Sequence, residues 1–371
     1  MWYIVLAFVW AISVANIIYV ASRIRRFSRV MNLAKKHRIS AWIVSLIPPL
    51  SLLLFAFINV FTLLIVTMHF LIAFILCDLV TLIIKKAAKK SFGYNIQNIV
   101  AILLAVIYLG AGWFFAHHVF VTEYTVYTDK DIGKDLRIVE IADLHLGITL
   151  DGEGFANQIK RVQNTNPDAV VIAGDFVDDD TKKQDMIIAC RALGNLKTTY
   201  GVYFIFGNHD EGYFNSRSFT TEELRKALTD NGVTILEDES VLIDDRFYIV
   251  GRKDRIVKTR ASADGLTKEL DSSKFIIILD HQPNDYENEA KTKADIVLSG
   301  HTHGGHIFPA GLIGIITGAN DRTYGTEVRN DTTFLVSSGI SGWAIPFKTG
   351  AVSEFVVIDI KHSNNESGDR L

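Results

Sequence analysis

The chain has 371 residues, 49% of them hydrophobic, and carries a formal net charge of −3 at pH 7. That small charge hides a division, because residues 1–120 hold 11 of the 38 basic residues and one of the 41 acidic ones, whereas the remainder has a net charge of −13. Such an acidic C-terminal part argues against tight nonspecific binding to nucleic acid, which depends on Lys and Arg neutralising phosphates. A nuclease function and a nucleic-acid partner are therefore not expected.

Residues 1–120 are expected to form a membrane domain with about four transmembrane helices. Residues 2–21 are one apolar run, close to the roughly 20 residues that a helix needs to cross a bilayer. Residues 41–84 contain one charged side chain, Asp78, and are long enough for two spans, and a fourth apolar run covers residues 96–119. A signal peptide is the alternative for the first run, but no basic segment precedes it and no small-residue cleavage pattern follows it.

The basic residues of this part predict its orientation. They gather in two clusters, 23–38 and 85–90, which the positive-inside rule keeps in the cytoplasm. Four spans then place everything after about residue 120 outside the cytoplasm. The expected protein is therefore a multi-pass protein of the cell membrane with an extracytoplasmic domain, and the lipid bilayer is its first partner. Three spans instead of four would put that domain in the cytosol.

Three residues within the apolar runs are candidates for a function in the membrane: Asn59, His69 and Asp78. An ionisable group in a span is a candidate for transport or lipid binding, whereas one near the end of a span can reach the interface at low cost. For Asp78 the structural interpretation is a pairing with the region of Lys85 and Lys86.

The remainder is expected to be one α/β domain over residues 136–361, with a linker over 121–135 before it and a disordered tail over 362–371 after it. Continuous apolar runs there indicate strands buried on both faces, and polar, helix-compatible stretches separate them. Strands are expected at 136–141, 169–173, 202–206, 247–250, 275–279, 296–299, 334–337 and 355–360. Helices are expected at 155–166, 185–196 and 221–231.

Five short motifs follow one another in this domain. They are Asp143-Leu144-His145, Gly174-Asp175-Phe176-Val177-Asp178, Gly207-Asn208-His209-Asp210, Asp280-His281 and Gly300-His301-Thr302-His303. Ligand sites in open α/β sheets cluster at the carboxyl ends of strands, so the side chains that follow the expected strands should meet at one rim. Carboxylates, imidazoles and an amide suit manganese, iron, zinc or magnesium-like ions. The set can hold two divalent ions about 3.5–4 Å apart, the arrangement that catalyses in-line displacement at phosphorus.

The motifs resemble the signature of the calcineurin-like metallophosphoesterases, which runs D-x-H, G-D-x-x-D, G-N-H-[DE], H and G-H-x-H. Every element has a counterpart between about residues 136 and 360, and the run 300–305 is most similar to a membrane-associated bacterial branch of that family. The resemblance implies a four-layer α-β-β-α sandwich, preceded in this chain by the α-helical transmembrane region. It also implies two divalent metal ions as cofactors, with manganese, iron or zinc as the expected identities.

The resemblance further implies seven metal ligands and a catalytic pair. The first ion would be held by Asp143, His145 and His303, the second by Asn208, His281 and His301, and Asp175 would bridge the two. His209 would not be a ligand but would lie beside the substrate, as a general acid or a phosphate-binding cation. Asp178 would orient it, since an Asp–His pair fixes the tautomer of the imidazole.

Two positions depart from that branch. It usually has Gln after the run GHTHGG, whereas this chain has His306, which either contacts substrate or is a structural histidine. Relatives tend to have Pro-x-Arg where this chain has Pro346-Phe347-Lys348. If that arginine contacts substrate, Lys348 would act as a point charge without bidentate contact. Four aromatic residues either line a substrate groove or are ordinary half-buried side chains: Tyr213, Phe214, Trp343 and Phe347.

The sequence therefore predicts a membrane-anchored, binuclear metal-dependent phosphoesterase. Its expected substrate is a phosphodiester or phosphomonoester, of a lipid or another cell-envelope molecule presented by the same membrane, and no protein partner can be inferred. One alternative is a tethered phosphatase or phosphodiesterase of soluble nucleotides. Another is a non-enzymatic membrane sensor or transporter that binds metal or phosphate, against which His209 weighs because a binding module needs no acid.

Overall fold

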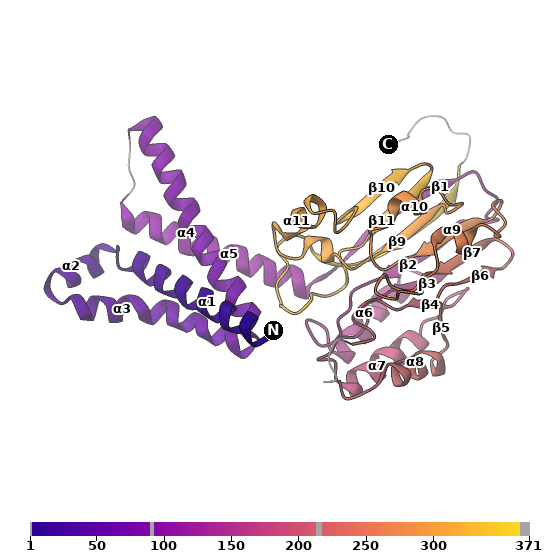
Figure 1. Ribbon diagram of the computed structural model, residues 1–371, viewed down its shortest axis with the longest axis horizontal. Coiled ribbons are helices and arrows are strands. Elements are labelled where there is room, and N and C mark those ends of the chain that lie inside the picture. Colours follow the sequence, from indigo (N-terminus) through magenta and orange to yellow (C-terminus); the bar gives the residue numbers. More distant parts are fainter. Residues whose placement is uncertain (1, 90–92, 213–216, 364–371) are drawn as a thin grey trace. The chain divides into compact units, whose positions relative to one another are not determined.

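The chain divides into two compact units, Met1–Trp113 and Phe114–Leu371, and the computed structural model describes residues 2–89, 93–212 and 217–363 (Figure 1). The described part of the first unit is helical. Its elements are α1 (Trp2–Ile24), α2 (Ser28–Lys36), α3 (Arg38–Leu50), η1 (Ser51–Phe57), α4 (Val60–Ala88) and α5 (Tyr94–His117). The last four residues of α5 belong to the second unit.

Within the described residues, four helical segments are long and apolar enough to cross a membrane, in agreement with the number predicted. They are Tyr3–Ile24, Arg38–Phe57, Val60–Ala88 and Tyr94–His117. The second continues from α3 into the 3₁₀ helix η1 just after Pro48 and Pro49, whose missing N–H groups interrupt the α-helical hydrogen bonds. The third begins at Asn59, whose side chain accepts the N–H of Thr62 at 2.8 Å. Asn59 is therefore a helix N-cap.

The predicted pairing of Asp78 with the region of Lys85 and Lys86 is wrong. Asp78 instead forms an ion pair with Arg23 of α1 and accepts a hydrogen bond from the Gln97 side chain of α5. Both lysines are exposed, whereas Arg23 is 3% exposed. A buried guanidinium requires a charged partner inside the bundle, and Asp78 is the carboxylate that meets this need.

His69, another of these three candidates, is bonded within its own helix. Its Nδ1 lies 2.7 Å from the carbonyl oxygen of Ile65, and its ring centroid lies 5.4 Å from that of Tyr108. These contacts satisfy the imidazole locally, as expected of a structural residue in a helical bundle.

The second unit contains two six-stranded sheets, with strand orders β1-β12-β2-β3-β4-β5 and β10-β11-β9-β8-β7-β6. The first is built from β1 (Val119–Thr128), β2 (Leu136–Ile141), β3 (Ala169–Ala173), β4 (Val202–Ile205), β5 (Val233–Ile235) and β12 (Ser353–His362). The second is built from β6 (Glu239–Ile243), β7 (Phe247–Gly251), β8 (Phe275–Leu279), β9 (Ile296–Ser299), β10 (Gly325–Arg329) and β11 (Thr332–Val336). The strands β2 to β5 are parallel neighbours, and so are β7, β8, β9 and β11.

Apolar side chains fill three spaces between the layers of this unit. Ile138 and Val171 of the first sheet pack in one cluster with Ile277 of the second. The outer face of the first sheet is covered by α6 (Gly152–Gln163), α7 (Lys183–Gly194) and α8 (Thr221–Asp230), and that of the second by α9 (Ala263–Thr267) and α10 (Tyr286–Glu289) (Figure 1). The fold is thus the four-layer α-β-β-α sandwich that the resemblance implies.

The expected linker over residues 121–135 is wrong, because Val119–Thr128 forms the edge strand β1. It pairs in parallel with β12 over ten residues, from Val119 opposite Ser353 to Thr128 opposite His362. Its burial alternates along the strand, as expected of an edge strand with one solvated face. The expected tail over 362–371 begins at the last residue of β12, and residues 364–371 lie outside the described part.

Candidate metal centre

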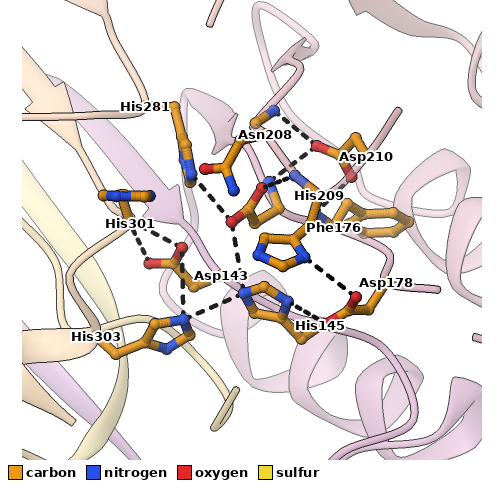
Figure 2. Close-up of polar contacts among 12 residues, drawn as sticks. Asp143, His145, Phe176, Asp178, Asn208, His209, Asp210, His281, His301 and His303 are labelled. Carbon is orange, nitrogen blue, oxygen red and sulfur yellow. Dashed lines mark hydrogen bonds and ion pairs between the residues drawn. The ribbon is translucent and has the colours of Figure 1, made fainter. Parts of the chain in front are cut away.

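The ends of parallel strands from both sheets bring the motif residues together. Asp143, Asp175 and Asn208 follow β2, β3 and β4, which are neighbours in the first sheet. His281 and His301 follow β8 and β9, which are neighbours in the second. Figure 2 shows the side chains of Asp143, Asn208, His281 and His301 directed towards one another, together with those of His145, His209 and His303. The rim predicted from the sequence is therefore formed by two facing sheets.

Asp143, His145 and His303 form the first group, and their potential ligand atoms lie within 4.8 Å of one another. The Nε2 atoms of His145 and His303 are 3.1 Å apart, and His303 Nε2 is 4.0 Å from Asp143 Oδ1. His145 holds its other nitrogen, Nδ1, 2.9 Å from Asp178 Oδ2, which favours a proton on Nδ1. If both Nε2 atoms are unprotonated, their lone pairs face each other at this distance, and a cation between them would remove the repulsion.

The second group consists of Asp175, His281 and His301, whose potential ligand atoms also lie within 4.8 Å of one another. Fully buried His281 donates from Nδ1 to the carbonyl oxygen of Ala173 at 2.7 Å. Its Nε2 has no hydrogen-bond partner and lies 3.1 Å from Asp175 Oδ2. A histidine whose tautomer is fixed by a backbone carbonyl, with its second nitrogen directed at a carboxylate, has the arrangement of a metal ligand.

The electrostatics of His281 also call for a positive charge here. Burial disfavours a charged imidazole, yet the pKa of His281 is raised well above its usual range, because the carboxylates of Asp175 and Asp143 face it. His301 behaves in the opposite way, since burial and the neighbouring His281 lower its pKa to about 3. A neutral His301 keeps a lone pair for a metal ion.

Asp175 lies between the two groups. Its Oδ2 is 3.1 Å from His281 Nε2 and 3.5 Å from His145 Nε2, while its Oδ1 accepts the backbone N–H of His209 at 2.8 Å. Although burial opposes ionisation, the facing imidazoles hold the pKa of this carboxyl well below its usual range. An ionised carboxylate in this position can contribute to both groups, as the sequence predicts for a bridging ligand.

Asn208 contributes the only amide among the expected ligands. It is 6% exposed, and Figure 2 shows its side chain beside His281. Its Oδ1 lies 3.5 Å from Nε2 of Gln282, a residue that the sequence did not single out. The Gln282 side chain is itself held by Asp254, with distances of 2.8 and 3.0 Å from Nε2 to the two carboxylate oxygens.

His209 and Asp178 form the expected pair at the edge of the site. His209 Nδ1 lies 3.1 Å from Asp178 Oδ1, so one carboxylate contacts both His209 and His145. Burial lowers the pKa of His209, but the hydrogen bond to Asp178 and the nearby Asp175 outweigh it, and the net shift is upward. The His209 ring lies 5.7 Å from that of Trp343, which is 44% exposed. This pair is therefore the more open part of the site.

Backbone geometry forces the side chains inward. Five of the seven expected ligands have φ angles in the left-handed region: Asp143 (53°), His145 (38°), Asp175 (53°), His301 (69°) and His303 (49°). This conformation is unfavourable for residues other than glycine, and such strain clusters at functional sites. The concentration of strained residues at one rim is a sign of function that is independent of the side-chain chemistry.

Asp210 is a residue of the site whose role the sequence did not predict. Its buried carboxylate accepts the backbone N–H groups of Asp175, Phe176, Val177 and Gly207 at 2.8–3.0 Å. These four bonds tie the loop after β3 to the loop after β4. The one feature of the sequence that could have indicated a role for Asp210 was its place at the end of the Gly-Asn-His-Asp motif.

The residues that the sequence suggested for substrate contact occupy different positions in the structure. Lys348 is fully buried, and its Nζ donates to the carbonyl oxygens of Ser338 at 2.6 Å and Gly339 at 3.0 Å, so it stabilises a loop and does not face solvent. Phe347 is 5% exposed and belongs to the core rather than to a groove. Half-buried His306 has its ring 5.3 Å from that of His303. Tyr213 and Phe214 lie outside the described residues.

Comparisons with known proteins agree with this geometry. A family model described as calcineurin-like phosphoesterase matches residues 136–305. An uncharacterized metallophosphoesterase of Helicobacter pylori is 32% identical over 250 residues, covering 66% of this chain and 64% of the relative. One of Campylobacter jejuni is 31% identical over 295 residues and 76% of each chain. A Danio rerio protein named transmembrane protein with metallophosphoesterase domain is 30% identical over 243 residues, covering 62% of this chain and 54% of that protein. The chain thus spans just under two thirds of the Helicobacter relative.

Proposed function

Since the chain belongs to the calcineurin-like phosphoesterase family, we propose that it is a membrane-anchored phosphoester hydrolase that works with two divalent metal ions. The observation that carries the proposal is the pair of ligand groups, Asp143 with His145 and His303, and Asp175 with His281 and His301. Asp175 Oδ2 of the second group also lies 3.5 Å from His145 Nε2 of the first. Asn208 completes the proposed second group.

The donor set fits hard or intermediate divalent ions. It contains carboxylate oxygens, imidazole nitrogens and an amide oxygen, and the described residues add no thiolate, because Cys190 is buried in the core cluster on the α6–α8 side. The 3.1 Å approach of His281 Nε2 to Asp175 Oδ2 and the 3.1 Å approach of His145 to His303 would both suit a bound divalent ion at each group. Manganese, iron and zinc are all compatible with these ligands.

The chain's own residues would divide the chemistry between them. When bound, two divalent ions polarise a phosphoryl oxygen and supply activated water. His209, held at Nδ1 by Asp178, carries a proton that it delivers to the leaving oxygen, and its raised pKa keeps that proton present near neutrality.

We further propose that the domain lies outside the cytoplasm and that its substrate is a phosphodiester or phosphomonoester of a lipid or another envelope molecule. Four candidate spans and a relative named as a transmembrane protein support attachment to the membrane. An enzyme confined to the membrane meets lipid-linked substrates at high local concentration, which favours them over soluble nucleotides.

The test is hydrolysis of bis-p-nitrophenyl phosphate and p-nitrophenyl phosphate by the full chain in detergent, stripped of metal and then supplied with Mn²⁺. We expect turnover that requires metal and that falls by at least about 100-fold in both Asp175→Asn and His209→Ala proteins. His209→Ala should still bind metal, whereas Asp175→Asn should not. A folded wild-type protein that binds two metal ions but hydrolyses neither these esters nor lipid phosphoesters would favour the sensor or transporter function.

A further inference from the structure

The segment that follows His303 exposes an unusual number of apolar side chains. Within residues 308–316, which include helix α11 (Ala310–Ile316), five large hydrophobic side chains are 42–83% exposed. We call these five the α11 surface: Phe308, Leu312, Ile313, Ile315 and Ile316. The described residues of the second unit expose thirteen large hydrophobic side chains in all, and the other eight are scattered over its length. Contiguous exposed apolar patches of this kind mark interaction sites.

The composition of the segment indicates what it contacts. Residues 296–320 contain no Asp, Glu, Lys or Arg, so no charge interrupts the α11 surface along the chain. Protein-binding surfaces usually combine an apolar centre with a polar or charged rim. Exposed apolar patches also mark sites of membrane interaction, and large aliphatic side chains without charged neighbours suit contact with the hydrocarbon of a lipid bilayer.

Contacts within the second unit connect this surface to the end of a candidate membrane span. Gly311 of α11 packs on Gly305, where an added Cβ would lie 2.9 Å from the Gly311 Cα. Gly305 in turn packs on Gly350, where an added Cβ would lie 3.1 Å from the Gly305 carbonyl carbon. Gly350 precedes Ser353 by three residues, which span at most about 10 Å. The Ser353 hydroxyl donates to the carbonyl oxygen of Ala116, in the last turn of α5, at 2.9 Å.

The same contacts connect the surface to the metal centre. His303, a proposed ligand, begins the short helix η2 (His303–Gly305), which leads through His306 into the α11 segment. Thr323 forms hydrogen bonds to both sides of this turn. Its carbonyl oxygen accepts a bond from the Thr302 hydroxyl, and its own hydroxyl donates to the Gly311 carbonyl oxygen at 3.0 Å. The α11 surface, the metal centre and the end of α5 therefore share one edge of the second unit.

We propose that the α11 surface inserts into the bilayer that α5 crosses, so that the metal centre receives a phosphate held at the headgroup level of that bilayer. The second part of this proposal rests on the function proposed above, whereas the insertion itself does not. A substrate would then reach the site without leaving the membrane. Its apolar part would stay among the lipids beside α11 while its phosphate approached the ligand groups.

Insertion is tested with the full chain in lipid vesicles. The protein carries one environment-sensitive fluorophore on an introduced cysteine. Cys77 is replaced by Ser, and the remaining native cysteine, Cys190, is buried and should not react with the label. The label is placed at Ile316→Cys, 83% exposed, or at the control Leu242→Cys. Leu242 is 41% exposed on β6, the edge strand opposite β10 in the same sheet. We expect blue-shifted emission, strongly quenched by nitroxide-bearing lipids, at position 316 and neither effect at 242. Equal quenching at both positions, or none at 316, would overturn the proposal.

A blue shift at position 316 without quenching by lipid would also overturn it, because it would assign the surface to a protein contact such as a second copy of the chain.

The substrate part is tested with an Ile313→Asp/Ile316→Asp protein and the matched control Leu242→Asp. We expect at least a tenfold loss on a phosphoester lipid in vesicles and unchanged hydrolysis of p-nitrophenyl phosphate, with the control unaffected. Equal loss on both substrates would reject this part. Wild-type protein that hydrolysed neither substrate would reject the proposed function and leave the insertion to be decided by quenching.

Discussion

At the scale of single residues, His281 is the most informative side chain of the site. Its Nδ1 is committed to the Ala173 carbonyl oxygen, so only Nε2 can bind an ion, and that atom has no hydrogen-bond partner. We predict that His281→Ala lowers the affinity for one of two metal ions by at least about tenfold. Metal content after dialysis against dilute Mn²⁺, measured by mass spectrometry, checks this prediction.

The matched control for His281 is His306→Gln, which places at this position the residue that the related branch usually has. His306 is half-buried near the ligands but belongs to neither group of potential metal ligands. The His306→Gln protein should therefore retain both metal ions. Full metal content in His281→Ala would show that its Nε2 binds a proton rather than a metal ion.

Lys348 gives a second prediction, this time about stability. Its Nζ donates to the carbonyl oxygens of Ser338, Gly339 and Val352 at 2.6–3.3 Å in a fully buried position. Lys348→Met leaves the Ser338 carbonyl oxygen without a donor, whereas the Gly339 and Val352 oxygens keep the Glu354 N–H and the Ser338 hydroxyl, and it should lower the free energy of unfolding by about 1–3 kcal/mol. Thermal unfolding in detergent measures the loss, and Lys226→Met, whose side chain is 74% exposed, should change little. A raised KM with unchanged stability would instead indicate that Lys348 contacts substrate.

The sequence predicted which residues meet at the site better than how they are held there. Asp143, Asp175 and His301 could be placed because each follows a continuous apolar strand. The left-handed backbone at these residues could not be predicted, because Asp and His adopt a positive φ more often than most residues but still only in a minority of cases. The role of Asp210 was missed for a related reason. A carboxylate that accepts backbone N–H groups from another loop depends on tertiary contacts that no local pattern records.

At the scale of elements, the loops after β3 and β4 pack so closely that glycine is required between them. A Cβ added to Gly207 would lie 2.2 Å from Asp175 Oδ1 and 2.5 Å from the Asp175 nitrogen. We predict that Gly207→Ala displaces Asp175, reduces bound metal and destabilises the domain by about 1–3 kcal/mol. Metal content and thermal unfolding check this together. Gly110→Ala in α5, where an added Cβ meets nothing within 4 Å, is the control, and equal behaviour of the two proteins would contradict the prediction.

The edge strands were the elements that the sequence predicted least well. The inner strands β2, β3 and β8 are continuous apolar runs because both faces are covered, and they were found where expected. The strand β1 alternates half-buried and exposed positions and contains polar residues such as Thr122 and Glu123, so it was taken for a linker. Its identity depends on β12, its partner more than 200 residues later.

At the scale of the whole molecule, the open question is the side of the membrane on which the metal centre lies. The basic clusters predict that the C-terminal end of α1 and the N-terminal end of α5 are both cytoplasmic. Contacts within the first unit support that these ends are together. Arg23, the penultimate residue of α1, has its carbonyl oxygen 2.8 Å from Asn98 Nδ2 near the start of α5, and the Ser28 N–H donates to Asn95 Oδ1 at 2.8 Å. Both helices therefore approach the same boundary of the bilayer.

If α1 ends and α5 begins at that boundary, the two helices cross in opposite directions, and we therefore predict that the residues after α5 lie on the opposite side from the basic clusters. We predict that Leu242→Cys, in a Cys77→Ser background, reacts with a membrane-impermeant maleimide in intact cells. Lys36→Cys, exposed at the end of α2, should react only after the membrane is permeabilised. The reverse pattern would place the metal centre in the cytosol and exclude envelope substrates of the outer leaflet. It would still be compatible with insertion of the α11 surface, because α5 would then deliver that edge of the domain to the inner leaflet.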